Sequence, residues 1–112
     1  MVRFGIVQSV RADGLDVVVV GEMDIDTAPE LRSRLLAAVQ AHDVVVLDLS
    51  GVTFIDSQGL SVLLRVNSQA KAAGTVLRLE RASARVRQLL ELTSLTSLFD
   101  LEPDPQKALP PR

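Results

Sequence analysis

The chain has 112 residues, of which 47% are hydrophobic and 23% charged, and its formal net charge is −2. This length and composition predict one domain that buries its own core, and the absence of cysteine excludes disulfides, a CxxC redox pair and cysteine-based zinc sites. The arginines are scattered and there is neither Trp nor Tyr, so we expect no basic face or stacking surface for nucleic acid and assign the partners to proteins.

The ends of the chain predict a soluble, cytoplasmic domain with a short tail. The amino terminus lacks a long apolar core followed by a cleavage site, and no apolar run reaches the roughly 18 residues that a membrane span needs. Residues 102–112 contain four of the five prolines. We therefore expect no membrane insertion, one domain over residues 1–101, and a frayed proline-rich tail over residues 102–112.

Two strand-like runs, at residues 4–10 and 16–21, open the chain. The Asp13-Gly14 pair between them is a strong turn signal, so the two runs should form an antiparallel hairpin. Residues 17–20 are four valines in succession, which is typical of a strand that is central in its sheet or covered on both faces.

A polar loop over residues 21–26 should separate the hairpin from the first helix. Its apolar residues Met23 and Ile25 either pack into the core or stand exposed as an anchor for a partner. Thr27 with Glu30 three residues later has the pattern of a capping box, so the helix should start there and run to about residue 41. Its expected buried stripe consists of Leu31, Leu35, Ala38 and Val39.

The middle of the chain predicts a strand that gives way to a helix at Ser57. Residues 44–49 form an apolar run, and helical spacing begins after the polar break at residues 56–59. On spacing alone Ser57 is either the helix cap or a residue that is covalently modified. The cap is a plausible role because Ser and Asp are both preferred at this position. Asp56 can cap the helix instead, and a phosphate on Ser57 would then meet the free N–H groups of the first turn.

The last third of the chain completes an α/β pattern. Gly74 should end the second helix, residues 75–79 should form a strand, and Ser83 should cap a third helix. A short final strand is expected at residues 98–101. The order β-β-α-β-α-β-α-β predicts a mixed β-sheet, in which an amino-terminal hairpin is followed by βαβ crossovers, packed with three to four helices.

The residue patterns of the common enzyme classes are absent. There is no GxSxG elbow, the single histidine, His42, lies at the far end of a predicted strand from Ser57, and no phosphate-binding P-loop is present. Asp24, Asp26 and Asp56 are expected at one edge of the sheet, but acidic loop residues are usually only solvated. We therefore expect no catalytic residue, no cofactor and no metal.

A receiver-type phosphoprotein is a third interpretation, which would place the phosphate on Asp48. The run from Asp43 to Asp48 is similar to the central strand of response-regulator receivers, in which the last aspartate accepts phosphate. The acidic pair and the lysine that complete such a site are missing. Asp48 is therefore interpreted as a structural residue at the end of its strand.

The sequence between Val46 and Leu64, with LDLSGVTFIDSQGL inside it, resembles the signature of the bacterial STAS-domain anti-sigma factor antagonists. The segment Gly21-Glu22-Met23-Asp24 is similar to that family's turn after the second strand, and residues 85–99 are similar to its third helix and final strand. The resemblance covers nearly the whole chain. Gln58 departs from it, because the family commonly has Ser or Thr at this position.

The resemblance implies a phosphorylation switch on Ser57. The unmodified protein would bind a partner that is both anti-sigma factor and serine kinase, releasing sigma factor, and phosphorylation would switch this binding off until a serine phosphatase reverses it. The alternative is a STAS subunit that docks on the ATPase of a membrane complex, such as a lipid-transport ABC transporter, without phosphorylation. The partner surface is predicted to comprise Met23, Asp24, Asp26, Thr27, Asp56, Ser57, Gln58 and Gly59.

Overall fold

The computed structural model describes residues 3–95 and 99. Within them the elements follow the predicted order, and they confirm a mixed α/β fold of four strands and three helices. Of the predicted strand at residues 98–101 only Phe99 is described, and its side chain is buried in the core, whereas the tail 102–112 lies outside the described residues. The elements are β1 (Phe4–Arg11), β2 (Gly14–Met23), α1 (Ala28–Ala41), β3 (Val44–Ile55), α2 (Ser57–Ala73), β4 (Val76–Ala82) and α3 (Ala84–Leu92).

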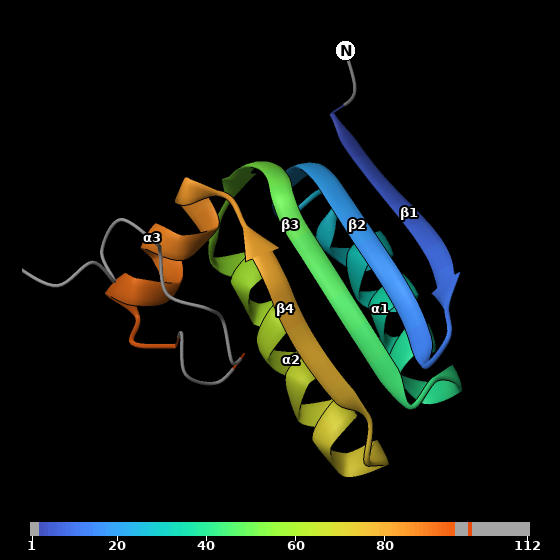
Figure 1. Cartoon of the computed structure of the whole chain (residues 1–112). Coiled ribbons are helices and arrows are strands. Elements are labelled where there is room, and N and C mark those ends of the chain that lie inside the picture. The colour runs from blue at the N-terminus through green and yellow to red at the C-terminus, as the bar shows by residue number, and fades with distance from the viewer. Residues whose placement is uncertain (1–2, 96–98, 100–112) are drawn as a thin grey trace, which may run out of the picture.

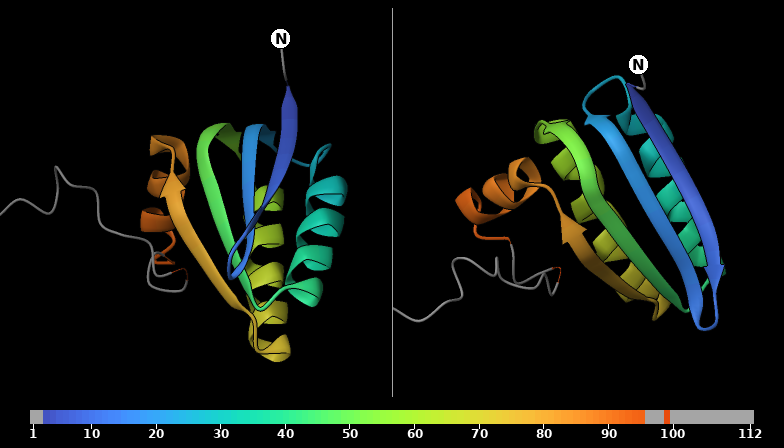
Figure 2. Two further views of the ribbon diagram at one scale, coloured as in Figure 1. Left: turned by 45° about the vertical axis from the view of Figure 1, so that its right-hand side comes forward. Right: turned by 45° about the horizontal axis from the view of Figure 1, so that its top comes forward.

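The strands form one sheet in the order β1-β2-β3-β4. β1 and β2 are the antiparallel hairpin, whereas β3 pairs in parallel with both β2 and β4. Figure 1 shows α1 and α2 side by side behind the sheet, and α3 beyond the end of β4. Both views of Figure 2 show α1 and α2 on the same face of the sheet. This arrangement follows from the crossovers β2-α1-β3 and β3-α2-β4, which are right-handed in nearly all proteins and so place both helices on one side.

The core lies between the sheet and the two covering helices. Side chains of β2 alternate between buried and half-buried along the strand, which fits a central strand whose helix-facing side is fully covered. Val17 and Val19 have no exposed surface, as the run of four valines predicted for a central strand. The buried stripe of α1 is also confirmed, and Ala28 adds to it.

Three strands run further than the sequence indicated, and one of them is β4, which was predicted to end at residue 79 and continues to Ala82. β2 continues through residues 21–23, which were predicted as a loop, and β3 continues from residue 49 to Ile55. The pairing of β2 with β3 shifts register between Val18 and Val20 and again after Gly21. These irregularities let the strands stay paired through Ser50-Gly51 and Gly21-Glu22, where the apolar alternation is interrupted.

The expected ends of the later helices are confirmed. Gly74 ends α2 in the left-handed conformation, with φ of 74°, which glycine adopts without steric penalty. The Ser83 hydroxyl accepts a hydrogen bond from the Val86 N–H and caps α3. Asp48 accepts hydrogen bonds from the backbone N–H and the hydroxyl of Ser50, so it has a local structural role in β3. In the described part of the chain, no helix combines the length and apolarity needed to cross a bilayer.

Candidate functional site

Ser57 is the first residue of α2, and it is not the residue that caps the helix. The Asp56 carboxylate accepts hydrogen bonds from the N–H groups of Gln58, at 2.9 Å, and Gly59, at 3.1 Å. The Ser57 side chain is exposed, and its hydroxyl forms no hydrogen bond with any residue that the structure describes. The division of roles between Asp56 as cap and Ser57 as a free hydroxyl is therefore as predicted.

One expectation about the first turn of α2 is wrong. A phosphate on Ser57 was expected to meet unpaired N–H groups there, but Asp56 already binds the N–H groups of Gln58 and Gly59 through its carboxylate and that of Leu60 through its carbonyl. A phosphate on Ser57 would instead lie next to the Asp56 carboxylate. The helix dipole still favours negative charge at this end, so repulsion and attraction oppose each other.

The start of α2 lies directly against the end of β2. The Asp56 N–H donates to the Met23 carbonyl at 3.2 Å. A Cβ atom at Gly59 would lie 2.4 Å from the same carbonyl oxygen, so only glycine permits this approach of helix to strand. The loop after β2 and the first turn of α2 therefore form one continuous surface around Ser57.

Asp24 organises the loop that connects β2 to α1. Its carboxylate accepts hydrogen bonds from the N–H groups of Asp26, at 3.0 Å, and Thr27, at 3.1 Å. The Thr27 hydroxyl donates to the Glu22 carbonyl at 2.8 Å instead of capping α1. The predicted capping box is therefore wrong, because Asp24 takes the loop N–H groups and Glu30 turns toward Arg34, 3.9 Å away.

Arg3, which directly precedes β1, lies beside this loop because β1 pairs with β2. Its guanidinium lies 3.0 Å from carboxylate oxygens of both Asp24 and Asp26, and 3.3 Å from that of Glu22. The hydrogen bond to Asp26, followed by that to Asp24, raises the pKa of Arg3 above its ordinary value. No sequence signal placed Arg3 at the site, since it lies near the start of the chain and the contact depends on the hairpin.

The pKa of Asp24 results from opposing causes. Burial alone would raise the pKa of this carboxyl, since an apolar environment disfavours the charged form. The Thr27 N–H, the Arg3 guanidinium and the Asp26 N–H all stabilise the ionised form and outweigh burial. The pKa of Asp24 is therefore lowered, and its negative charge at neutral pH is a fixed part of the loop.

The structure divides the predicted partner surface into exposed and buried residues. Met23 is fully buried in the core, Gly59 is buried against it, and Asp24 and Thr27 are each only 8% exposed because they are occupied within the loop. These four therefore expose little surface of their own, and partner contact by the predicted set stays a prediction. The exposed or half-exposed members are Asp26, Asp56, Ser57 and Gln58.

Ile25 belongs to the exposed surface and was missing from the predicted set. Its side chain is 66% exposed, whereas that of Met23 is inside the core. The sequence left the two residues undecided between core and anchor. The structure places Met23 in the core and leaves Ile25 exposed, so the anchor role stays a prediction for Ile25 alone. Met23 points inward because it is the last residue of β2 and follows the inward alternation of that strand.

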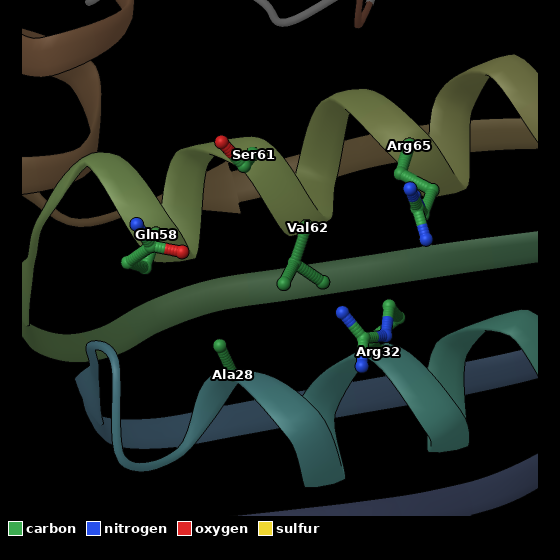
Figure 3. A pocket seen from close by; sticks show the side chains of 6 residues that line it. All are labelled: Ala28, Arg32, Gln58, Ser61, Val62 and Arg65. Atoms are coloured by element: carbon green, nitrogen blue, oxygen red, sulfur yellow. The ribbon is translucent and has the colours of Figure 1, made fainter.

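Gln58 faces a groove between α1 and α2. Figure 3 shows its side chain beside Ala28 at one end of a cavity of about 230 Å³, with Arg32 and Arg65 further along. The unusual glutamine after Ser57 is therefore a link between the Ser57 surface and this groove. Around the site, the described residues contain no group of three or more His, Asp or Glu side chains arranged to hold a metal ion.

Comparison with known proteins decides the family. The family model described as the STAS domain matches residues 6–108. The anti-sigma-B factor antagonist of Bacillus subtilis is 31% identical over 87 residues, which cover 78% of this chain and 80% of that protein. The chain belongs to the STAS-domain family of anti-sigma factor antagonists.

Solved structures show the same fold for this STAS domain. An anti-sigma factor antagonist from Mycobacterium paratuberculosis superposes with a TM-score of 0.78 at 29% identity, covering 94% of this chain and 90% of that one. The anti-sigma factor antagonist SpoIIAA in its unphosphorylated form gives a TM-score of 0.72 at 16% identity, covering 93% of this chain and 92% of that one. At 16% identity the second comparison shows the fold alone.

Proposed function

We propose that this STAS domain is an anti-sigma factor antagonist, a binding module without catalytic activity, whose affinity for an anti-sigma factor kinase is controlled by phosphorylation of Ser57. The observation that carries the proposal is the exposed Ser57 hydroxyl, which has no hydrogen-bond partner among the described residues because Asp56 caps the helix. The names of the related antagonists support the same role.

The surface around Ser57 suits a protein partner. Ile25 offers an exposed apolar side chain, and Asp26 and Asp56 place carboxylates on the same surface. Apolar anchors and complementary charges are what a specific interface uses for affinity and for orientation. The matching partner would present an apolar pocket near Ile25 and basic side chains near the two aspartates.

Phosphorylation would act by local charge. The kinase would transfer the γ-phosphoryl group of ATP to the Ser57 oxygen, releasing ADP and the hydroxyl proton and adding about −1.5 to −2 charges. Burying that charge unpaired in an interface costs several kcal/mol, which lowers affinity by a factor on the order of 10³. A serine phosphatase in the cytoplasm would restore the binding form.

Replacement of Ser57 tests the acceptor. We expect Ser57→Ala to bind the kinase but to take up no phosphate when incubated with kinase and ATP, as measured by intact mass. Ser33→Ala is the matched control, because Ser33 is an exposed serine of α1 and does not line the groove that Gln58 faces. Uptake of phosphate by Ser57→Ala would exclude Ser57 as the acceptor. Failure of the unmodified wild type to bind a kinase would favour the transporter-subunit alternative.

A further inference from the structure

The groove between α1 and α2 extends away from the Ser57 surface. Its first part is the cavity that Gln58 lines, and a second cavity of about 500 Å³ continues along the helices with Arg65 at the boundary of both. Figure 3 shows Arg32 on α1 and Arg65 on α2 directed toward each other across the groove. The first cavity is lined by Ala28, Arg32, Gln58, Ser61, Val62 and Arg65.

Arg32 and Arg65 are exposed and have no counter-charge within residues 3–95. Neither forms a hydrogen bond or an ion pair with any residue that the structure describes, whereas Arg3, Arg11 and Arg34 are all paired with carboxylates. Two guanidinium groups on opposite walls of one groove repel each other, and an anion between them removes that repulsion. The planar, multiply donating guanidinium group is well suited to bind a carboxylate.

The charge of the two helices differs in sign from that of the whole chain. Together α1 and α2 carry four basic side chains and one acidic side chain, whereas the chain has a formal net charge of −2. On the other side of Ser57 lie Glu22, near the end of β2, and Asp24 and Asp26 of the β2–α1 loop, with Arg3 as their partner. Ser57 therefore lies between an acidic loop and a basic groove.

We propose that the α1–α2 groove receives an acidic segment of the same anti-sigma factor kinase, with a carboxylate held between Arg32 and Arg65. This inference rests on the proposed function and extends the interface beyond Ser57. The Gln58 amide and the Ser61 hydroxyl line the same cavity and offer further hydrogen-bond donors. A nucleic acid fits less well, because a polyanion that reached the groove would also meet the acidic loop.

The two charged regions give the complex a fixed orientation. A partner with basic residues opposite the acidic loop and acidic residues opposite the groove binds in one direction only, because the reverse orientation brings like charges together. The groove would then supply affinity that phosphorylation does not remove directly, since Arg32 and Arg65 lie along the helices rather than at Ser57. The charge on Ser57 and the contacts in the groove would thus contribute separately to the affinity for the kinase.

Charge reversal tests the groove. The purified kinase is titrated by calorimetry into wild type, Arg32→Glu, Arg65→Glu and the double variant. We expect each single variant to bind on the order of 10-fold more weakly and the double variant about 100-fold more weakly, with the difference shrinking at high salt. Circular dichroism checks that the variants remain folded, which is expected because both arginines are exposed.

Arg78→Glu is the matched control. Arg78 is an exposed arginine of β4 between the inward-pointing Leu77 and Leu79, so it lies on the sheet face opposite the helices. Its reversal should leave kinase affinity within about 2-fold of wild type, since it changes net charge equally but not the groove.

The outcomes separate the two proposals. If the kinase binds wild type and the double variant equally, the groove proposal is overturned while the proposed function stands. If wild type binds no kinase, both are overturned. A third arm titrates inorganic phosphate into the wild type and the double variant. Phosphate binding to the wild type at low millimolar concentration, together with an unchanged kinase affinity of the double variant, would assign the groove to a small anion and overturn the acidic-segment proposal. Weakening confined to the Arg32 and Arg65 variants supports it.

Discussion

Asp24 shows at the level of one residue why the loop beside Ser57 is well defined. A single carboxylate accepts two loop N–H groups and also pairs with Arg3, which comes from the far end of β1. Thr27 adds a hydroxyl hydrogen bond to the Glu22 carbonyl. The Asp24 and Thr27 side chains that fix the loop are thus buried, whereas Arg3 and the neighbouring Ile25 and Asp26 are exposed.

Arg3→Gln should raise the pKa of Asp24. The wild-type pKa is lowered, so the ionised carboxylate contributes stability above the unfolded-state pKa of about 3.9, and this contribution is lost as the pH falls through the lower folded-state value. Without the guanidinium, burial opposes ionisation more effectively and the loss begins at higher pH. A carbon-detected NMR titration of the Asp24 carboxyl measures the shift, and an unchanged midpoint would show that the backbone N–H groups suffice.

Asp56→Ala should destabilise the domain more than Ser57→Ala does. Asp56 satisfies two N–H groups of α2, and removal of such a cap costs about 1 kcal/mol, which lowers Tm by roughly 4–8 °C for a domain of this size. The Ser57 hydroxyl has no partner in the described structure, so its removal should change Tm little. Differential scanning calorimetry compares the two, and a larger effect at Ser57 would reverse their assignment.

At the scale of elements, sequence periodicity predicted the hairpin, the helix stripes and the mixed sheet. These features depend on the local alternation of apolar and polar residues and on turn or stop residues such as Gly74, both of which can be recognised directly in the sequence. The ends of β2 and β3 were missed because Glu22 and Ser50 interrupt the apolar pattern, while backbone pairing continues through irregular register. Backbone pairing between distant segments leaves no local mark in a sequence.

The candidate site was predictable only in part. The positions of Ser57 and its cap Asp56 follow from local helix-start chemistry, and both were predicted. The role of Arg3 depends on a tertiary contact with Asp24, 21 residues away, and the extension of β2 that places Met23 in the core depends on its pairing with Ile55 of β3, so local rules could not supply either. The capping box at Thr27 was wrong for a local reason, because the Asp24 carboxylate accepts the hydrogen bond from the Thr27 N–H that the Glu30 side chain would otherwise accept.

Gly59→Ala should weaken the packing between α2 and β2. The added methyl group would lie 2.4 Å from the Met23 carbonyl oxygen, and such overpacking costs about 1–3 kcal/mol, more than the helix propensity gained from alanine. Ser61→Ala, on the exposed face of α2, should be nearly neutral. Urea unfolding measures both, and equal stability of the two variants would contradict the close contact at Gly59.

At the scale of the whole molecule, the surface around Ser57 combines three kinds of contact. The acidic β2–α1 loop and the exposed Ile25 lie on one side, and the α1–α2 groove with its two arginines lies on the other. Under the proposed phosphorylation the Ser57 side chain between them would gain about −1.5 to −2 charges without disturbing the core, since Ser57 is exposed. Binding is therefore expected to change while the fold remains the same.

The affinity of the phosphorylated chain for the kinase tests this account most directly. Calorimetry with the unmodified protein and with protein phosphorylated on Ser57 gives two dissociation constants under the same conditions. The account predicts that phosphorylation weakens binding by a factor on the order of 10³, with no change in the circular dichroism of the free domain. Equal affinity of the two forms, within a few-fold, would contradict it.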